Sequence, residues 1–204
     1  MAKESNQKLA SRQKVLLNQL LQIYPIQEIL SSNDTTARYT IKAIELPLEV
    51  TYSTSYYSSY YYYSTSSAMY DDQISTALGY TCHSILMICD YYNISLRYPI
   101  IHNSSRSMIQ NYENSNAISY PLFKMSLVEK EMLENGLDLL RKNVDGICCM
   151  LMEDGGIQSR KGEQINILAK LNHLCQYLLR DGRNDGALDW RSESFYSKAG
   201  SDDD

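Results

Sequence analysis

The sequence lacks any long apolar segment. No apolar run in its 204 residues approaches the roughly 20 residues that are needed to cross a bilayer. The N-terminal stretch MAKESNQKLASRQK also lacks the apolar core of a signal peptide. We therefore expect a cytoplasmic protein whose contact with membranes is peripheral.

The sequence also has none of the short motifs that mark common catalytic and cofactor sites. The phosphate-binding patterns GxxxxGK[ST] and GxGxxG are absent, and so are HExxH, the EF-hand loop and the GxSxG elbow. We therefore predict no catalytic residue, no cofactor and no metal site, and a protein that is not an enzyme.

Histidine is scarce, with three residues, and one of them lies close to possible nucleophiles. His102 is followed by Ser104 and Ser105, which suggests the pairing of a small Ser–His hydrolase. Such catalysis needs a base that a third group orients and an oxyanion hole, and sequence neighbours rarely provide that geometry. The hydrolase that would use Ser105 and His102 is therefore a minor alternative.

The cysteine spacing argues against a zinc or disulfide site, and the lack of excess positive charge argues against nucleic-acid binding. The five cysteines show no CxxC spacing, and an odd number within apolar helical patterns predicts reduced, buried thiols rather than zinc ligands or disulfides. The formal net charge is −5, and residues 181–204 hold seven acidic and three basic side chains, so the remaining chain is nearly neutral. No broad cationic face for a nucleic-acid backbone is evident, and we predict no nucleic-acid partner.

A helix is predicted over residues 3–23, which contain no Gly or Pro. Its Leu and Ile residues recur at heptad spacing, as in the last turns of a coiled coil. This spacing predicts a partner-helix seam at Leu9, Leu16, Leu20 and Ile23. An amphipathic helix packed on its own domain is an equally supported interpretation. Tyr24-Pro25 ends the helix, because the residue before a proline avoids helical geometry.

The next two segments differ sharply in composition. Residues 37–50 are rich in β-branched side chains and predict one strand that ends near Pro47. Residues 51–70 are almost entirely Ser, Thr and Tyr and hold eight of the 18 tyrosines. No pattern in this tract would fix a strand register, so we expect an inserted loop. Alternatively, the clustered tyrosines contact a membrane surface, and the protein is a peripheral membrane-binding module.

The middle of the chain predicts a buried helix followed by extended structure. Residues 76–92 are apolar almost all round, which places this helix in the core. The short segment of residues 94–101 is apolar and rich in β-branched side chains, and it predicts a strand that bends at Pro99. Residues 111–121 predict a polar loop.

Two amphipathic helices and a polar tail complete the chain. Ser126 and Glu129 have the spacing of a capping box, and Gly155-Gly156 is a typical helix end. Between them, apolar residues follow each other in steps of three and four at Leu133, Leu137, Leu140, Val144, Ile147 and Leu151. Residues 163–180 predict a last helix with one apolar face.

These elements predict an α+β fold. We expect the end of a coiled-coil helix at residues 1–24 and a compact domain of about three amphipathic helices and a small sheet at residues 25–180. The tyrosine-rich insertion at residues 51–70 interrupts this domain, and residues 181–204 form a disordered acidic tail.

Five segments, in this order, resemble the C-terminal half of the UV radiation resistance-associated protein family. The segments are LASRQKVLLNQLLQIYPI (residues 9–26), IELP (44–47), ALGYTCHSILMICDYYNISLRYPIIHNSSRSMI (77–109), ENGLDLLRKNVDGI (134–147) and INILAKLNHLCQYLLR (165–180). The pattern RYPIIHxxSRS is the most specific part. The motif core within the third segment comprises Leu78, Gly79, Tyr80, Arg97, Tyr98, Pro99, Ile100, Ile101, Ser105 and Arg106.

The resemblance implies a function that composition does not reveal. It implies a non-catalytic scaffold subunit of a class III phosphatidylinositol 3-kinase complex, which acts in endosomal trafficking and autophagy. The implied partners are a Beclin-like protein, which pairs through the coiled coil, the lipid kinase, and its pseudokinase-like subunit. The implied location is peripheral, on endosomal and autophagic membranes. Two features depart from the family pattern, because the sequence has only the last coiled-coil heptads and carries the tyrosine-rich tract in place of a shorter loop.

Overall fold

The computed structural model describes residues 2–29, 38–47, 65–112, 117–123, 130–152 and 165–180. The described helices are α1 (Ala2–Ile23), α2 (Thr65–Tyr92), α3 (Lys130–Leu151) and α4 (Ile167–Leu179). One antiparallel sheet has the order β1 (Ile26–Ile29), β2 (Arg38–Ile41) and β3 (Ile44–Glu45). The other has the order β4 (Ile100–Ile101), β5 (Met108–Asn111) and β6 (Ile118–Pro121). The predicted α+β class is confirmed, with two small sheets where one was expected.

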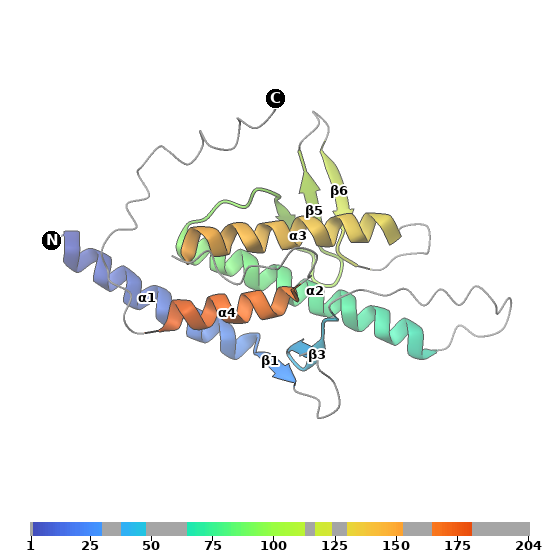
Figure 1. Cartoon of the computed structure of the whole chain (residues 1–204), viewed down its shortest axis with the longest axis horizontal. Coiled ribbons are helices and arrows are strands. Elements are labelled where there is room, and N and C mark those ends of the chain that lie inside the picture. Colours follow the sequence, from blue (N-terminus) through green and yellow to red (C-terminus); the bar gives the residue numbers. More distant parts are fainter. Residues whose placement is uncertain are drawn as a thin grey trace, which may run out of the picture.

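The helices form the body of the molecule, and each sheet covers a different part of it. Helix α4 lies along α1 and against α3, while the β5–β6 hairpin projects beyond α3 (Figure 1). The first sheet packs on α2 and α4, and the second packs on α3. Every helix and both sheets supply fully buried side chains to the core, among them Leu17, Ile41, Ile85, Ile109, Leu140 and Leu171.

The first helix ends where its sequence predicts, at Ile23, and begins at Ala2, one residue before the predicted start. The last backbone bond of α1 joins the Tyr24 amide to the Leu20 carbonyl at 2.8 Å, and Pro25, which has no amide hydrogen, follows. Leu17 and Leu20 are buried at 0% and 3% exposure, and the helix contacts α2 and α4. One face of α1 is therefore part of the domain core.

The prediction of a single strand over residues 37–50 is wrong. The chain forms β2, reverses at Lys42 and Ala43, and returns as β3, with Ile41 paired to Ile44. Both turn residues have positive φ values, 50° and 61°, and this geometry usually selects Asn-Gly. Because Lys-Ala is an unusual pair for such a turn, the sequence contains no recognisable signal for it.

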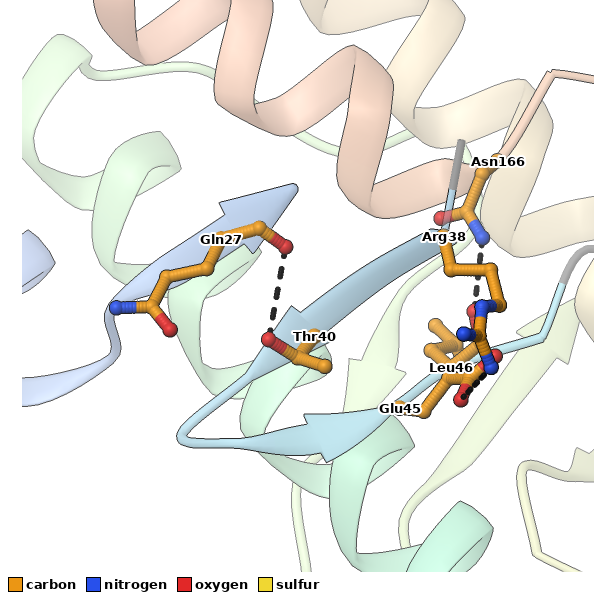
Figure 2. Close-up of polar contacts among 6 residues, drawn as sticks. All are labelled: Gln27, Arg38, Thr40, Glu45, Leu46 and Asn166. Atoms are coloured by element: carbon orange, nitrogen blue, oxygen red, sulfur yellow. Dashed lines mark hydrogen bonds and ion pairs between the residues drawn. The ribbon is translucent and has the colours of Figure 1, made fainter. Parts of the chain in front are cut away.

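Side-chain contacts reinforce the first sheet. The Thr40 hydroxyl donates to the Gln27 carbonyl of β1 at 3.5 Å, and Arg38 and Glu45 form an ion pair at 3.6 Å across β2 and β3 (Figure 2). Strand β1, which pairs with β2 along its full length, was not predicted. It has a single half-buried side chain, Ile26, so no alternating apolar pattern marks it.

Two predictions about the second sheet are also corrected. Only Ile100–Ile101 of the predicted strand over residues 94–101 is paired, and the predicted loop over residues 111–121 contains β6. Strand β6 pairs with β5 from Asn111 opposite Ile118 to Met108 opposite Pro121. These strands are two to four residues long, so pairing with a neighbour rather than local periodicity determines them.

Helix α2 begins at Thr65, eleven residues before the predicted start at Thr76. The last six residues of the predicted tyrosine-rich loop, residues 65–70, are therefore helical. Residues 51–64 lie outside the described residues, as do the predicted capping box, the Gly155-Gly156 helix end and the predicted tail. The apolar stripe of α3 is buried as predicted, from Leu133 to Leu151.

Asn166 begins α4 and ties it to the first sheet. Its side-chain oxygen accepts from the Leu168 amide at 2.8 Å, and its side-chain nitrogen donates to the Leu46 carbonyl at 2.8 Å (Figure 2). The predicted start of this helix, at residue 163, lies outside the described residues. The cap therefore joins two segments that are 120 residues apart.

We expect Asn166→Ala to lower the free energy of unfolding by about 2 kcal/mol, because a helix cap and a hydrogen bond contribute about 1 kcal/mol each. Asn166→Asp keeps the acceptor and loses the donor, so about half of that loss is expected. Urea denaturation checks both, with the exposed Gln176→Ala in the same helix as the control. Equal losses for Ala and Asp would show that the Leu46 contact alone matters.

Candidate functional site

The predicted partner-helix seam divides between two faces of α1. Leu20 is in the core at 3% exposure, and the Gln13 side chain, one heptad earlier, donates to the Tyr91 carbonyl of α2 at 2.8 Å. Leu9 and Ile23 are 58% and 56% exposed, and Leu16 is half-buried between them. These three residues, seven apart, form an open row that we name the outer row. The helix therefore packs on its own domain and also keeps an apolar row on its surface.

Two basic residues, Lys8 and Arg12, lie along one side of the outer row, and α1 as a whole is basic. Helix α1 contains Lys3, Lys8, Arg12 and Lys14 and one acidic residue, Glu4. Lys8 pairs with Glu4 at 2.8 Å, and Lys14 donates to the Arg180 carbonyl at 3.3 Å. The helix has a formal charge of +3, from four basic residues minus one acidic residue, in a chain with a net charge of −5.

The motif core lies where α2 meets the loop of residues 102–107. A Cβ atom on Gly79 would lie 2.2 Å from the Ser104 carbonyl oxygen, so only glycine fits at this backbone contact. Ser104 has a φ of 49°, which favours glycine, yet buried Ser107 supports the loop. The Ser107 hydroxyl donates to the Ser104 carbonyl at 2.8 Å and accepts from the Asn103 amide at 3.1 Å. The loop is therefore held against α2.

A second contact fixes the RYPII part of the motif. The Asn143 side chain of α3 accepts from the Tyr98 amide at 3.1 Å and donates to the Tyr98 carbonyl at 2.7 Å. Both residues are 3% exposed. The Asn143 side chain thus bonds to both backbone polar groups of Tyr98, as a neighbouring strand would do.

The motif residues differ in exposure, which separates packing roles from surface roles. Leu78, Gly79 and Tyr98 are buried, and Arg97, Ile101 and Arg106 are exposed. The remaining motif residues are half-buried, namely Tyr80, Pro99, Ile100 and Ser105. The Arg97 and Arg106 guanidinium groups lie 5.4 Å and 5.6 Å from the Tyr98 and Phe123 ring centres. The motif is therefore mainly a structural junction, with Tyr80 and Ser105 facing a surface pocket.

That pocket, which we name the histidine pocket, has a volume of about 230 Å³ and is lined by Tyr24, Thr76, Tyr80, His102, Ser104 and Ser105. The His102 ring stacks on His83 with 4.7 Å between ring centres. His83 Nδ1 shares a hydrogen bond of 2.7 Å with the Tyr24 hydroxyl. The sequence did not predict this pocket, because its residues come from the end of α1, from α2 and from the loop after β4.

Burial shifts the pKa values of two side chains that line the pocket. Burial, and then the neighbouring His83, lowers the pKa of His102, while burial, and then Tyr80, raises the pKa of Tyr24. His102 is therefore neutral at pH 7, and the Tyr24 hydroxyl keeps its proton.

The hydrolase alternative gains no support from this geometry. His102 and Ser105 line the same pocket, but among the described residues no hydrogen bond joins them and no carboxylate orients His102. Burial also raises the pKa of Cys82, Cys89 and Cys175 to about 12, so these thiols stay protonated and are poor nucleophiles at neutral pH.

The described residues contain neither a metal-ligand cluster nor a membrane-spanning helix. No described cluster of three or more His, Cys, Asp and Glu side chains could hold a metal ion. In the same part of the chain, no helix has the length and apolarity that a membrane span requires.

The described residues define a small α+β domain with a helical face open along α1. Over 145 residues, the chain is 32% identical to the UV radiation resistance-associated protein of Mus musculus. The match covers 69% of this chain and 18% of that protein, so the chain spans less than a fifth of the length of this relative. No family model matches the chain. The similarity confirms the predicted resemblance, and the chain is related to the UV radiation resistance-associated protein.

Proposed function

We propose that this protein is a non-catalytic scaffold subunit of a class III phosphatidylinositol 3-kinase complex in endosomal trafficking and autophagy. It pairs with a Beclin-like protein through α1 and is peripheral on the membranes where the complex acts. The observation that carries this proposal is the outer row, in which exposed Leu9 and Ile23 and half-buried Leu16 follow a heptad spacing, in a chain related to the UV radiation resistance-associated protein.

The chemistry of α1 specifies the partner helix. An apolar heptad row in water is stabilised when a second helix with the same repeat covers it. Because Lys8 and Arg12 lie along one side of the row, we expect acidic residues at the partner positions that face this side. Arg12, one turn from Leu9 and Leu16, is the cation best placed to set the register.

The size of the row limits what it contributes. Burying the exposed part of a Leu or Ile side chain of the row gives on the order of 1–2 kcal/mol or less. The three residues of the row therefore fall short of the ~8 kcal/mol of a micromolar complex. The row positions the partner, and further surface of the complex supplies the remaining affinity. Such a subunit acts by orienting a kinase and performs no bond chemistry itself.

The test replaces the two most exposed residues of the row. Leu9→Asp with Ile23→Asp should abolish co-purification with a Beclin-like protein and the lipid kinase from cells. The free energy of unfolding should change by less than about 0.5 kcal/mol per site, because neither side chain is in the core. Leu20 is unsuitable for this test, since its replacement by Asp would disrupt the core.

The matched control is Ser11→Asp with Asn18→Asp, two exposed positions that are also seven apart on α1 and receive the same charge. The control should retain the partner. If the two double variants recovered the partner equally, the proposed pairing through α1 would be wrong. Failure of the unaltered, folded chain to recover either protein would remove the proposed function.

A further inference from the structure

We propose that the histidine pocket binds a phosphate monoester group, with Lys42, His102, Tyr80 and the Ser104 and Ser105 hydroxyls as its donors. None of these donors belongs to the outer row, although Tyr24 of the pocket lining directly follows Ile23, and the ligand differs from the proposed protein partner. The proposal therefore stands or fails independently of the proposed function.

The first argument is the chemistry of the lining. Among the described residues, six side chains line the pocket; each carries a hydroxyl or an imidazole, and none of the six carries a carboxylate. The Lys42 ammonium lies 5.4 Å from the Tyr80 ring centre and 5.9 Å from the Tyr24 ring centre, which places a cation beside the pocket. A group of neutral donors with one cation and no lining carboxylate selects an anion.

The second argument is that these donors are available. The Thr76 hydroxyl already donates to the Asp72 carbonyl, and Tyr24 is engaged with His83. Among the described residues, no hydrogen bond or ion pair occupies the Lys42 ammonium, the Tyr80 hydroxyl or the Ser105 hydroxyl. Glu45, on the strand after the Lys42 turn, is paired with Arg38 and does not neutralise Lys42.

The third argument is that the site is preorganised. The close approach of Gly79 and the bonds of Ser107 hold the loop that carries Ser104 and Ser105. His102, which is exposed, is stacked on His83, and this contact favours one orientation of its ring. Donors that are already in place lose little entropy when a ligand binds.

The fourth argument is size. A pocket of about 230 Å³ is smaller than the roughly 300–1,000 Å³ typical of sites for drug-sized ligands. It therefore accommodates one tetrahedral anion rather than a nucleotide. A monoester phosphate, which carries close to two negative charges at pH 7, interacts with Lys42 more strongly than a singly charged diester does.

The experiment uses the three histidines of the chain as reporters. Inorganic phosphate is titrated into the full chain at constant ionic strength, with chloride as the comparison, and the imidazole signals are followed by NMR. We expect saturable shifts for His102 and His83, while His173, which does not line the pocket, stays unchanged. Shifts of equal size at all three histidines, or none at His102, would overturn the proposal.

The variant Lys42→Gln should weaken phosphate binding about tenfold, because it removes the cation of the site. Lys8→Gln removes the same charge from an exposed position on α1 and should leave binding unchanged. Ser105→Ala should weaken binding by a smaller factor. If the two lysine variants reduced phosphate binding equally, binding would depend on net charge alone, and the proposed site would be refuted.

A second arm of the experiment identifies the source of the phosphate. Phosphatidylcholine vesicles that contain phosphatidic acid, a monoester, are compared with vesicles that contain phosphatidylserine, a diester. Preferential, Lys42-dependent sedimentation with phosphatidic acid indicates a lipid headgroup. A response to inorganic phosphate without vesicle binding indicates a free phosphate. Vesicle binding that does not distinguish the two lipids, together with no response to phosphate, contradicts the proposal.

Discussion

Gly79→Ala should lower the free energy of unfolding by about 3 kcal/mol. Alanine normally stabilises a helix interior relative to glycine by up to about 1 kcal/mol, so the expected change has the opposite sign to helix propensity. The cause is the new Cβ atom, which would lie 2.2 Å from the Ser104 carbonyl oxygen and 2.6 Å from its carbonyl carbon. Because both are backbone atoms, the loop must move as a unit, and overpacking of this kind costs about 1–3 kcal/mol or more.

Two glycines of α3, Gly136 and Gly146, serve as comparisons for Gly79 of α2. Gly146 has open space around its Cβ position, so Gly146→Ala should stabilise the protein by up to about 1 kcal/mol. Gly136 is intermediate, with the Pro121 carbonyl oxygen at 2.9 Å, and Gly136→Ala should cost about 1 kcal/mol. Urea denaturation of the three variants should rank Gly146, Gly136 and Gly79 in order of decreasing stability. A Gly79→Ala variant as stable as Gly146→Ala would show that α2 and the loop do not meet as described.

The Gly79 variant should also affect the histidine pocket. If the loop moves away from α2, Ser104 and Ser105 leave their positions beside Tyr80. The proposed phosphate binding should then weaken more than the loss of global stability explains. Measuring binding under conditions in which the variant is still folded separates the two effects.

Asn143→Leu should lower the free energy of unfolding by about 3 kcal/mol, although leucine is a better helix former and has the same branching at Cγ. The substitution removes the two hydrogen bonds that the Asn143 side chain makes to the amide and the carbonyl of Tyr98, which is 3% exposed. Each buried backbone group that loses its hydrogen bond costs about 1–3 kcal/mol. Thermal or urea denaturation gives the value directly.

The control for this prediction is Lys142→Leu, at the neighbouring and exposed position of α3. It introduces the same side chain into the same helix and should change stability by less than about 0.5 kcal/mol. A small effect of Asn143→Leu would mean that Tyr98 finds other partners, such as water. In that case Asn143 would not be what holds the RYPII segment against α3.

These two contacts hold the segment from Gly79 to Arg106 in place. Gly79 lets a helix and a loop touch through their backbones, and Asn143 holds the connecting strand end from the other side. The surface that results presents Tyr80 and Ser105 to the same pocket. Packing and a surface site therefore share one junction.

The helices could be predicted from the sequence because their signals are local. The period of 3.6 residues in the apolar stripe of α3 and the Tyr24-Pro25 end of α1 need no information from distant parts of the chain. The start of α2 at Thr65 was missed because Ser, Thr and Tyr have weak helix propensity and no apolar stripe marks them.

The short strands and the sites could not be predicted in the same way. Strand β1 has one half-buried residue, and the turn at Lys42 and Ala43 has positive φ values without Gly or Asn. Their structure depends on pairing partners and on α2 and α4, which lie far away in the sequence. The seam on α1 is an intermediate case, since the heptad spacing was visible but the face that each residue occupies was not.

The sequence alone determined the helical framework, the α+β class and the relationship to the UV radiation resistance-associated protein, because each depends on local patterns or on residue identity. The tertiary structure alone decided that Leu20 belongs to the core while Leu9 and Ile23 stay exposed. It also decided that Tyr24, Tyr80 and His102 share one pocket. The physical reason is that burial and proximity arise from contacts between segments tens of residues apart, which no local periodicity encodes.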